Sequence, residues 1–211
     1  MSARGKFISF EGGEGAGKST QARKLKAALE ACGRQVVLTR EPGGSPGAEE
    51  IRKLLVEGAP ERWTPLTETL LFIAARADHV AKIIAPALDA GQWVISDRFA
   101  DSTYVYQGVA RGLGVDTVRR LHDAAIPAFK PDLTLILDLD PATGLSRASK
   151  RGGGAEDRFE KFDANFHAAL RGAFHEIAAN EPKRCVIIDG ARDPDAVADD
   201  VLRIVTERLS P

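Results

Sequence analysis

The stretch ISFEGGEGAGKST, residues 8–20, begins as an apolar run and then places four glycines within six residues. Lys18, Ser19 and Thr20 follow directly. Because glycines carry no side chain, their backbone N–H groups can converge on an anion, and a helix that begins after them adds the positive end of its dipole. The stretch therefore predicts a strand, an anion-binding loop and a helix in succession.

The loop matches the P-loop pattern Gly-x4-Gly-Lys-Ser, in which the lysine reaches the β- and γ-phosphates of a nucleoside triphosphate and the hydroxyl binds Mg²⁺. A tight glycine turn without a ligand is the alternative. The motif does not separate a switch GTPase, a motor ATPase and a small-molecule kinase. The residues expected to bind ATP are Gly12, Gly13, Glu14, Gly15, Ala16, Gly17, Lys18, Ser19 and Thr20.

Composition narrows the class of protein further. A chain of 211 residues suits one compact domain, 1–211, with room for a small insert. The net charge of −1 gives no broad field for nucleic acid or a membrane surface, and no apolar run approaches the roughly 18 residues of a membrane span. The two cysteines, Cys32 and Cys185, have no disulfide or metal spacing, so we expect a reducing, cytoplasmic location.

Five apolar segments rich in valine and isoleucine predict strands that are buried on both faces. They lie at 6–11, 35–40, 93–97, 133–139 and 184–189. Between and after them, apolar residues recur at helical spacing in segments 18–32, 70–80, 162–177 and 194–209. Alternating strands and helices imply a doubly wound α/β fold, a five-stranded parallel sheet that binds ligands at the carboxyl ends of its strands.

Two further strand ends carry charged residues. The segment WVISD (93–97) ends on Asp97, a carboxylate suited to hold Mg²⁺, and Arg98 beside it would bridge phosphates. The segment TREPGG (39–44) lies at another strand end, at the rim where a second substrate would bind. A surface ion pair is the alternative for the first, and a Pro-Gly turn with solvated charges for the second.

The amphipathic segment LLFIAARADHV (70–80) places Phe72 and Arg76 four residues apart, on one face of a helix. An aromatic ring can stack on a base, and an arginine can donate to a base carbonyl. A core phenylalanine beside a surface arginine explains the pair equally simply, and the residues alone favour that explanation.

Taken together, the segments FEGGEGAGKST, TREPGG, LLFIAARADH, SDRFADSTYVYQG and KPDLTLILDLDPATGLSR resemble, in order and spacing, thymidylate kinase, the dTMP kinase of bacteria. The resemblance runs from about residue 5 to the C-terminus. It implies a P-loop kinase fold with a small lid at about 144–160, and transfer of the γ-phosphoryl group of ATP to dTMP, giving dTDP and ADP in dTTP synthesis. It also implies Mg²⁺ as cofactor and a homodimer. The apolar helices expected around 66–90 and 115–126 are candidate interface elements, and ordinary core packing explains them equally well.

The resemblance assigns roles to single residues. Phe72 would stack on thymine, Arg76 would donate to its O4 edge, and Tyr106 would crowd the sugar 2′ position and favour deoxyribose. Glu14 would lie near the 3′-hydroxyl, and Arg40, Arg52 and Arg98 would surround the dTMP phosphate. Glu41 precedes Pro42 in a turn whose peptide bond we expect to be cis. The implied substrate-binding residues are Glu14, Arg40, Glu41, Pro42, Arg52, Phe72, Arg76, Arg98, Ser102, Tyr106 and Gln107. The implied metal-binding residues are Ser19 and Asp97.

This chain departs from the family pattern at three positions. Phe99 replaces a tyrosine, and Val105 replaces a small residue and would crowd the pocket wall. Gly15 stands where some members carry a basic residue in the P-loop. Phosphoryl transfer needs positive charge over the equatorial oxygens. We therefore expect the glycine-rich segment SRASKRGGGAEDRFE (146–160) to supply arginines from a lid, although a solvated loop is the alternative. The implied catalytic residues are Lys18, Arg98, Arg147, Arg151 and Arg158.

Two rival functions stay open on the sequence. One is another nucleotide or nucleoside kinase of the same fold. The other is a nucleotide-dependent binding switch, although the chain has no Asn-Lys-x-Asp stretch of the kind that specifies guanine.

Overall fold

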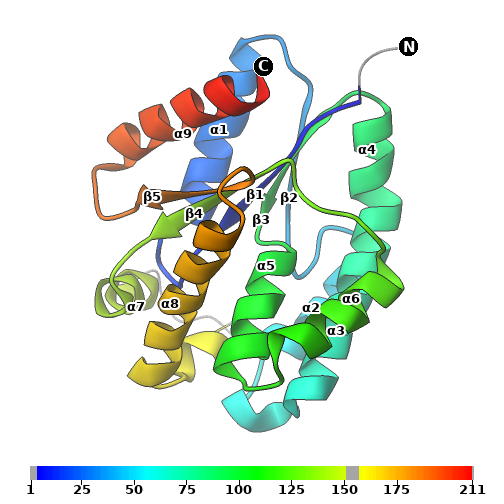
Figure 1. The fold of residues 1–211 in the computed structure, drawn as a ribbon, viewed down its shortest axis with the longest axis vertical. Coiled ribbons are helices and arrows are strands. Elements are labelled where there is room, and N and C mark those ends of the chain that lie inside the picture. The colour runs from blue at the N-terminus through cyan, green and yellow to red at the C-terminus, as the bar shows by residue number, and fades with distance from the viewer. Residues whose placement is uncertain (1–3, 151–156, 211) are drawn as a thin grey trace.

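The computed structural model describes residues 4–150 and 157–210, in which a five-stranded parallel sheet runs through the centre (Figure 1). The strand order is β2-β3-β1-β4-β5, with every pairing parallel. The strands are β1 (Phe7–Glu11), β2 (Val36–Arg40), β3 (Trp93–Asp97), β4 (Leu133–Asp138) and β5 (Cys185–Asp189). Each expected strand is therefore present, and the expected fold class is confirmed.

Helices cover both faces of the sheet (Figure 1). One face packs against α1 and α9, whose apolar residues join Ile8 and Phe10 of β1 in a single buried cluster. The opposite face packs against α4, α5 and α8. The helices are α1 (Lys18–Ala31), α2 (Pro46–Val56), α3 (Pro65–His79), α4 (Ala85–Asp89), α5 (Ala100–Thr103), α6 (Val115–Ala125), α7 (Pro141–Lys150), α8 (Ala164–Asn180) and α9 (Pro194–Leu209).

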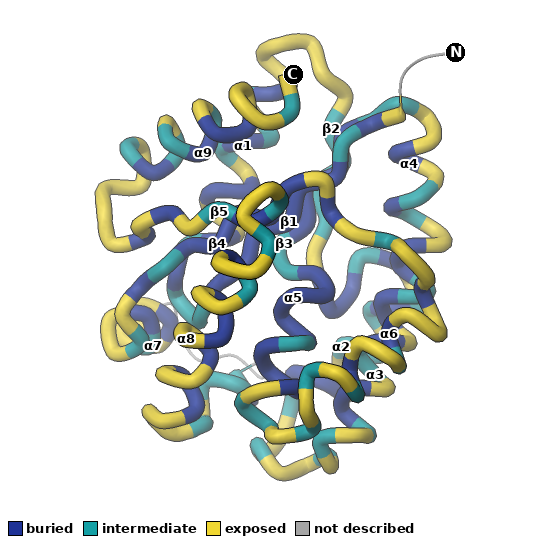
Figure 2. Tube along the Cα trace, viewed as in Figure 1, coloured by how far each residue is buried: buried dark blue, intermediate teal, exposed yellow. Residues whose placement is uncertain are grey.

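Two stretches continue helices in π-helical form, at Val80–Ile84 and Tyr104–Ala110. The first joins α3 to α4, and the second extends α5 with Tyr106 and Gln107. Figure 2 shows that the extended α5 is mostly buried, in contrast to the exposed outer turns of α9. A short 3₁₀ turn, Pro60–Arg62, follows α2, and another, Arg158–Lys161, precedes α8.

Local chemistry explains where several helices begin. Asp193 accepts a hydrogen bond from the backbone of Asp195, and Pro194 occupies the first turn of α9, as the sequence predicts. Helix α3 begins at Pro65 behind a Thr64 cap, one residue before the helical stretch expected around 66–90. Thr64 and Pro65 are themselves a helix start signal.

Among the described residues, no helix combines the length and apolar character that crossing a bilayer requires. The expected lid at about 144–160 falls partly on α7 and partly on the Arg158–Lys161 turn. Its central part, including Arg151, lies outside the described residues.

Candidate active site

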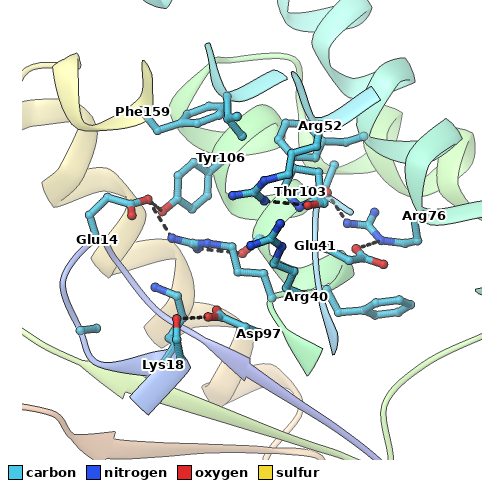
Figure 3. A pocket seen from close by; sticks show the side chains of 18 of the residues that line it. Glu14, Lys18, Arg40, Glu41, Arg52, Arg76, Asp97, Thr103, Tyr106 and Phe159 are labelled. Atoms are coloured by element: carbon cyan, nitrogen blue, oxygen red, sulfur yellow. Dashed lines mark hydrogen bonds and ion pairs between the residues drawn. The ribbon is translucent and has the colours of Figure 1, made fainter. Parts of the chain in front are cut away.

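A cavity of about 240 Å³ opens where β1, β2 and β3 end (Figure 3). Most of the residues that the sequence analysis selected line it. These are Glu14, Gly15, Ala16, Gly17, Lys18, Ser19, Arg40, Glu41, Pro42, Arg52, Phe72, Arg76, Asp97, Arg98, Ser102, Tyr106 and Gln107. Gly12 and Gly13 line a smaller neighbouring cavity, and Thr20 is exposed in the first turn of α1. Parallel strands bring these distant segments to one edge of the sheet.

The P-loop crosses from β1 to α1 with the lysine drawn inward. Lys18 is only 7% exposed, and its Nζ donates to the carbonyl oxygens of Gly12 at 3.1 Å and Gly13 at 2.7 Å. Burial, together with the positive charge of Arg98, lowers the pKa of Lys18 to about 8. Phosphates entering this cavity would favour the charged ammonium again, because an opposite charge stabilises it.

Ser19 and Asp97 meet at the mouth of the cavity. The Ser19 hydroxyl donates to the Asp97 carboxylate, so a helix N-terminus and a strand end share one hydrogen bond. Both side chains offer the hard oxygen atoms that Mg²⁺ prefers, and Mg²⁺ in nucleotide sites takes few protein ligands besides phosphate oxygens. The donor set therefore fits this ion.

Arg98 is the hub of the charged side of the cavity. It adopts a left-handed backbone conformation, φ 72°, and its guanidinium donates to Gly12 O at 3.0 Å and to Ser102 Oγ at 3.1 Å. Its Nη2 also donates to Glu14 Oε1 at 2.7 Å, and that oxygen accepts a 2.8 Å bond from the Tyr106 hydroxyl. Although burial opposes it, Arg98 with Lys18 and this hydroxyl lowers the pKa of Glu14 to about 2.

The expected base pocket lies on the other side, where Arg76 comes from α3. Arg76 is only 2% exposed, so it is not a surface residue. Its Nε donates to Glu41 Oε2 at 2.7 Å and its Nη2 to Thr103 Oγ1 at 2.9 Å, whereas Nη1 is buried with no hydrogen-bond acceptor among the described residues. Such a donor is costly to leave unpaired, and Arg76 lines the cavity.

Two arginines lie at the rim that the TREPGG segment forms. Arg40 pairs with Glu49 at 3.2 Å, and Arg52 Nη1 donates to the carbonyl oxygen of Pro42 at 2.7 Å. The peptide bond between Glu41 and Pro42 is cis, as the sequence analysis suspected. Arg40 and Arg52, which Figure 3 labels, line the cavity, as Arg98 does. The rim is therefore cationic, as an anionic second substrate requires.

Comparison with known proteins agrees with this geometry. The sequence model of the family described as thymidylate kinase matches residues 10–201. The chain belongs to the thymidylate kinase family. A thymidylate kinase of Ruegeria pomeroyi is 55% identical over 210 residues, 100% of this chain and 99% of that protein. One of Bradyrhizobium sp. (strain ORS 278) is 54% identical over 207 residues, 98% of this chain and 92% of that protein.

A solved structure shares the fold as well. The crystal structure of thymidylate kinase from Ehrlichia chaffeensis matches with a TM-score of 0.77 at 34% identity, over 96% of this chain and 99% of that one. The reaction of thymidylate kinases is phosphoryl transfer from ATP to dTMP, and the chain is an enzyme of this nucleoside monophosphate kinase class.

Arg147 and Arg158 were expected to reach the phosphates from a lid, but the structure places both against backbone carbonyl oxygens. Arg158 does not face the cavity; its guanidinium is 0% exposed and donates to the carbonyl oxygens of Leu55, Ala59 and Pro60. Arg158 also forms an ion pair with the buried Glu68, and these partners together hold its guanidinium away from the cavity. Arg147 donates to the carbonyl oxygen of Gly190 at 3.1 Å.

Gly15 has a packing reason in this chain. Its φ is 67°, and a Cβ placed there would lie 2.0 Å from the carbonyl oxygen of Gly144 in α7. Backbone thus meets backbone between the P-loop and α7. A basic side chain at this position has no room unless α7 shifts.

Several residues of the site were not predicted from the sequence. Val56, Phe99, Thr103, Phe159 and Glu160 also line the cavity. Glu11 lies behind it, accepting bonds from the Phe99 backbone at 2.8 Å and from Ser102 Oγ at 2.5 Å. Burial, then the charge of Asp101, raises the pKa of Glu11 to about 8. A carboxylate that ends an otherwise apolar strand was the available signal for Glu11.

Proposed function

We propose that this chain transfers the γ-phosphoryl group of ATP to dTMP, giving dTDP and ADP, as a step of dTTP synthesis. The observation that carries the proposal is the buried, unpaired Nη1 of Arg76 in a cavity continuous with the P-loop. Its place beside Phe72 suits a flat base with a carbonyl acceptor at its edge. Membership of the thymidylate kinase family supports the same substrate.

ATP would bind through the P-loop, from Gly12 to Thr20. Backbone N–H groups and the N-terminus of α1 would hold its phosphates, and Lys18 would follow the charge that develops on the β- and γ-phosphates. Ser19 and Asp97 would hold Mg²⁺, which when bound neutralises charge on the phosphate oxygens.

The second nucleotide would place its phosphate among Arg40, Arg52 and Arg98. A phosphate oxygen of dTMP is already anionic, so it attacks the γ-phosphorus without a base; the new O–P bond forms as the bond to ADP breaks. The protein's task is to hold two polyanions in line. Tyr106 and Glu14, hydrogen-bonded to each other at 2.8 Å, would lie against the sugar.

The remaining cationic groups would come from the lid. Arg147 lies in the last turn of α7, directly before the glycine-rich stretch that contains Arg151. We propose that these two arginines, rather than Arg158, supply charge to the transition state in the closed enzyme. Lid closure would also exclude water and limit ATP hydrolysis.

We also propose that the chain forms a homodimer and is located in the cytoplasm. Leu66 and Leu70, one turn apart on α3, are 46% and 47% exposed, and the exposed Leu54 lies on α2, which packs against α3. Such an apolar face supports a homodimer, in line with the expectation from sequence. The free thiols of Cys32 and Cys185 support a reducing cytoplasm.

One measurement tests the function directly. The purified chain with Mg²⁺-ATP should form ADP rapidly with dTMP and only slowly without it. Equal ADP formation in both conditions would contradict the proposal and favour a nucleotide-dependent switch. A stronger response to another nucleoside monophosphate would indicate a different kinase of this fold.

Arg76 and Phe72 should have separable effects on base choice. Cytosine presents an amino donor where thymine presents O4, so it faces Arg76 with a donor. An unpaired buried polar group costs about 1–3 kcal/mol, so dCMP should be disfavoured by roughly 5- to 150-fold at this contact. Arg76→Ala should weaken the binding of dTMP and lower the ratio of kcat/KM for dTMP over dCMP.

Phe72→Ala is the matched variant, because stacking tolerates any base. It should reduce kcat/KM for both nucleotides to a similar extent. The measurement is kcat/KM for dTMP and dCMP in wild type and both variants. An unchanged ratio in Arg76→Ala would mean that this arginine does not contact the base edge.

A further inference from the structure

Glu68 is a completely buried carboxylate behind Gln107, which lines the active-site cavity. It lies on α3 and is 0% exposed, as is its ion-pair partner Arg158. Its Oε1 accepts a 2.8 Å hydrogen bond from Nε2 of Gln107, and Nε of Arg111 lies 3.7 Å from the same oxygen. A buried charge persists only when it is paired, so Arg158, with Arg111 farther away, allows a carboxylate at this place.

This carboxylate determines the orientation of a neighbouring amide. Carboxylate oxygens only accept hydrogen bonds, so Gln107 must turn its NH₂ group toward Glu68. The carbonyl oxygen of the amide then points away from Glu68. Gln107 is 1% exposed and lines the active-site cavity, so it presents an acceptor to a ligand there.

We propose that Glu68, with Arg158 as its counterion, makes the base pocket selective for thymine by locking the amide of Gln107. The proposal rests on the function proposed above. Thymine carries a donor at N3–H next to the O4 carbonyl, whereas cytosine carries an acceptor at N3 next to an amino group. The acceptor on Gln107 thus suits N3–H of thymine, and the donor on Arg76 suits its O4. Cytosine would instead present an acceptor to Gln107 and a donor to Arg76. Glu68 is a positioning residue, acting through Gln107.

The same ion pair fixes the segment that closes this part of the cavity. Arg158 is followed directly by Phe159 and Glu160, and both line the cavity. The ring of Phe159 lies 6.0 Å from Phe72 and 5.6 Å from Tyr106, centroid to centroid. The wall around the base is therefore assembled from three segments that meet at Glu68.

The test is Glu68→Gln, which keeps the shape and removes the charge. A glutamine offers both a donor and an acceptor, so the amide of Gln107 can turn over and accept cytosine as well. We expect the ratio of kcat/KM for dTMP over dCMP to fall by about tenfold or more, one lost hydrogen-bond preference of roughly 1.4 kcal/mol. The KM for ATP should stay within about twofold of wild type.

Two further variants separate positioning from a merely structural role. Asp101→Asn breaks a different buried pair, with Arg184, and should leave the ratio unchanged even where it lowers Tm. Glu68→Asp keeps the charge but withdraws the oxygen from Gln107, so it should also lower the ratio, and it decides the matter if Glu68→Gln does not fold.

A ratio within twofold of wild type in the folded Glu68 variants would overturn the proposal. The proposal would also be overturned if Glu68→Gln lowered this ratio equally in an enzyme that already carries Gln107→Leu, because Glu68 could not then act through that amide. Wild-type enzyme that does not phosphorylate dTMP would instead overturn the proposed function, and this inference with it.

Discussion

Replacement of Lys18 by alanine should reduce kcat by about 10²- to 10³-fold, the usual effect of removing one preorganised cationic donor from a transition state. Lys18 is drawn into the P-loop by the carbonyl oxygens of Gly12 and Gly13, and it lines the cavity between the two expected nucleotides. Its charge is therefore available where the phosphoryl group moves. The measurement is steady-state ADP formation with saturating ATP and dTMP.

The matched control is Lys24→Ala on the same helix. Lys24 is more exposed and pairs with Asp195, away from the cavity, so this variant should keep wild-type turnover. Folding is checked by Tm, which should change little for Lys18→Ala, because burial already disfavours the charged lysine. A folded Lys18→Ala enzyme with near-normal turnover would contradict the assignment of the P-loop.

Replacement of Arg158 by alanine should destabilise the fold by about 3–5 kcal/mol, because it leaves the buried carboxylate of Glu68 with only the more distant Arg111, at 3.7 Å, as counterion. Three backbone carbonyl oxygens also lose their donor. For a domain of this size the loss corresponds to a decrease in Tm of roughly 6–20 °C. Thermal unfolding followed by circular dichroism measures it.

Two comparisons sharpen this experiment. Arg171→Ala removes an exposed arginine paired with Asp138 and should cost less than about 1 kcal/mol. The double variant Arg158→Ala with Glu68→Gln should recover part of the lost stability, since the unpaired charge is gone. If Arg158→Ala instead kept its Tm and lost only kcat, the position over the phosphates that was expected from sequence would be the correct one.

The fold followed from local patterns that the sequence carries openly. Continuous apolar runs located all five strands to within about one residue at each end, because strands buried on both faces need no polar alternation. The helical stretch expected around 66–90 is present from Pro65 to Asp89. The apolar pattern did not show that its middle, Val80–Ile84, is π-helical, because that depends on backbone hydrogen bonds and not on which face is apolar.

The site divides in the same way. The P-loop from Gly12 to Ser19, the strand-end Asp97 and the cis bond at Pro42 belong to short motifs, so their chemistry could be assigned from neighbours in the chain. Thr103 and Glu11 lie inside quoted segments but received no role from the sequence. Each became part of the site only through hydrogen bonds to residues from other segments.

The sequence by itself determined the doubly wound fold, the phosphate-binding loop and, through the family resemblance, the nucleotide pair. Only the tertiary structure decided which charges are paired. The residues alone favoured a surface position for Arg76, and the family resemblance made Arg158 a lid cation. Both are buried against carboxylates, Glu41 and Glu68, that are remote in sequence. The reason is physical: removing a charge from water is costly, and whether a partner repays that cost depends on distances that only the folded chain sets.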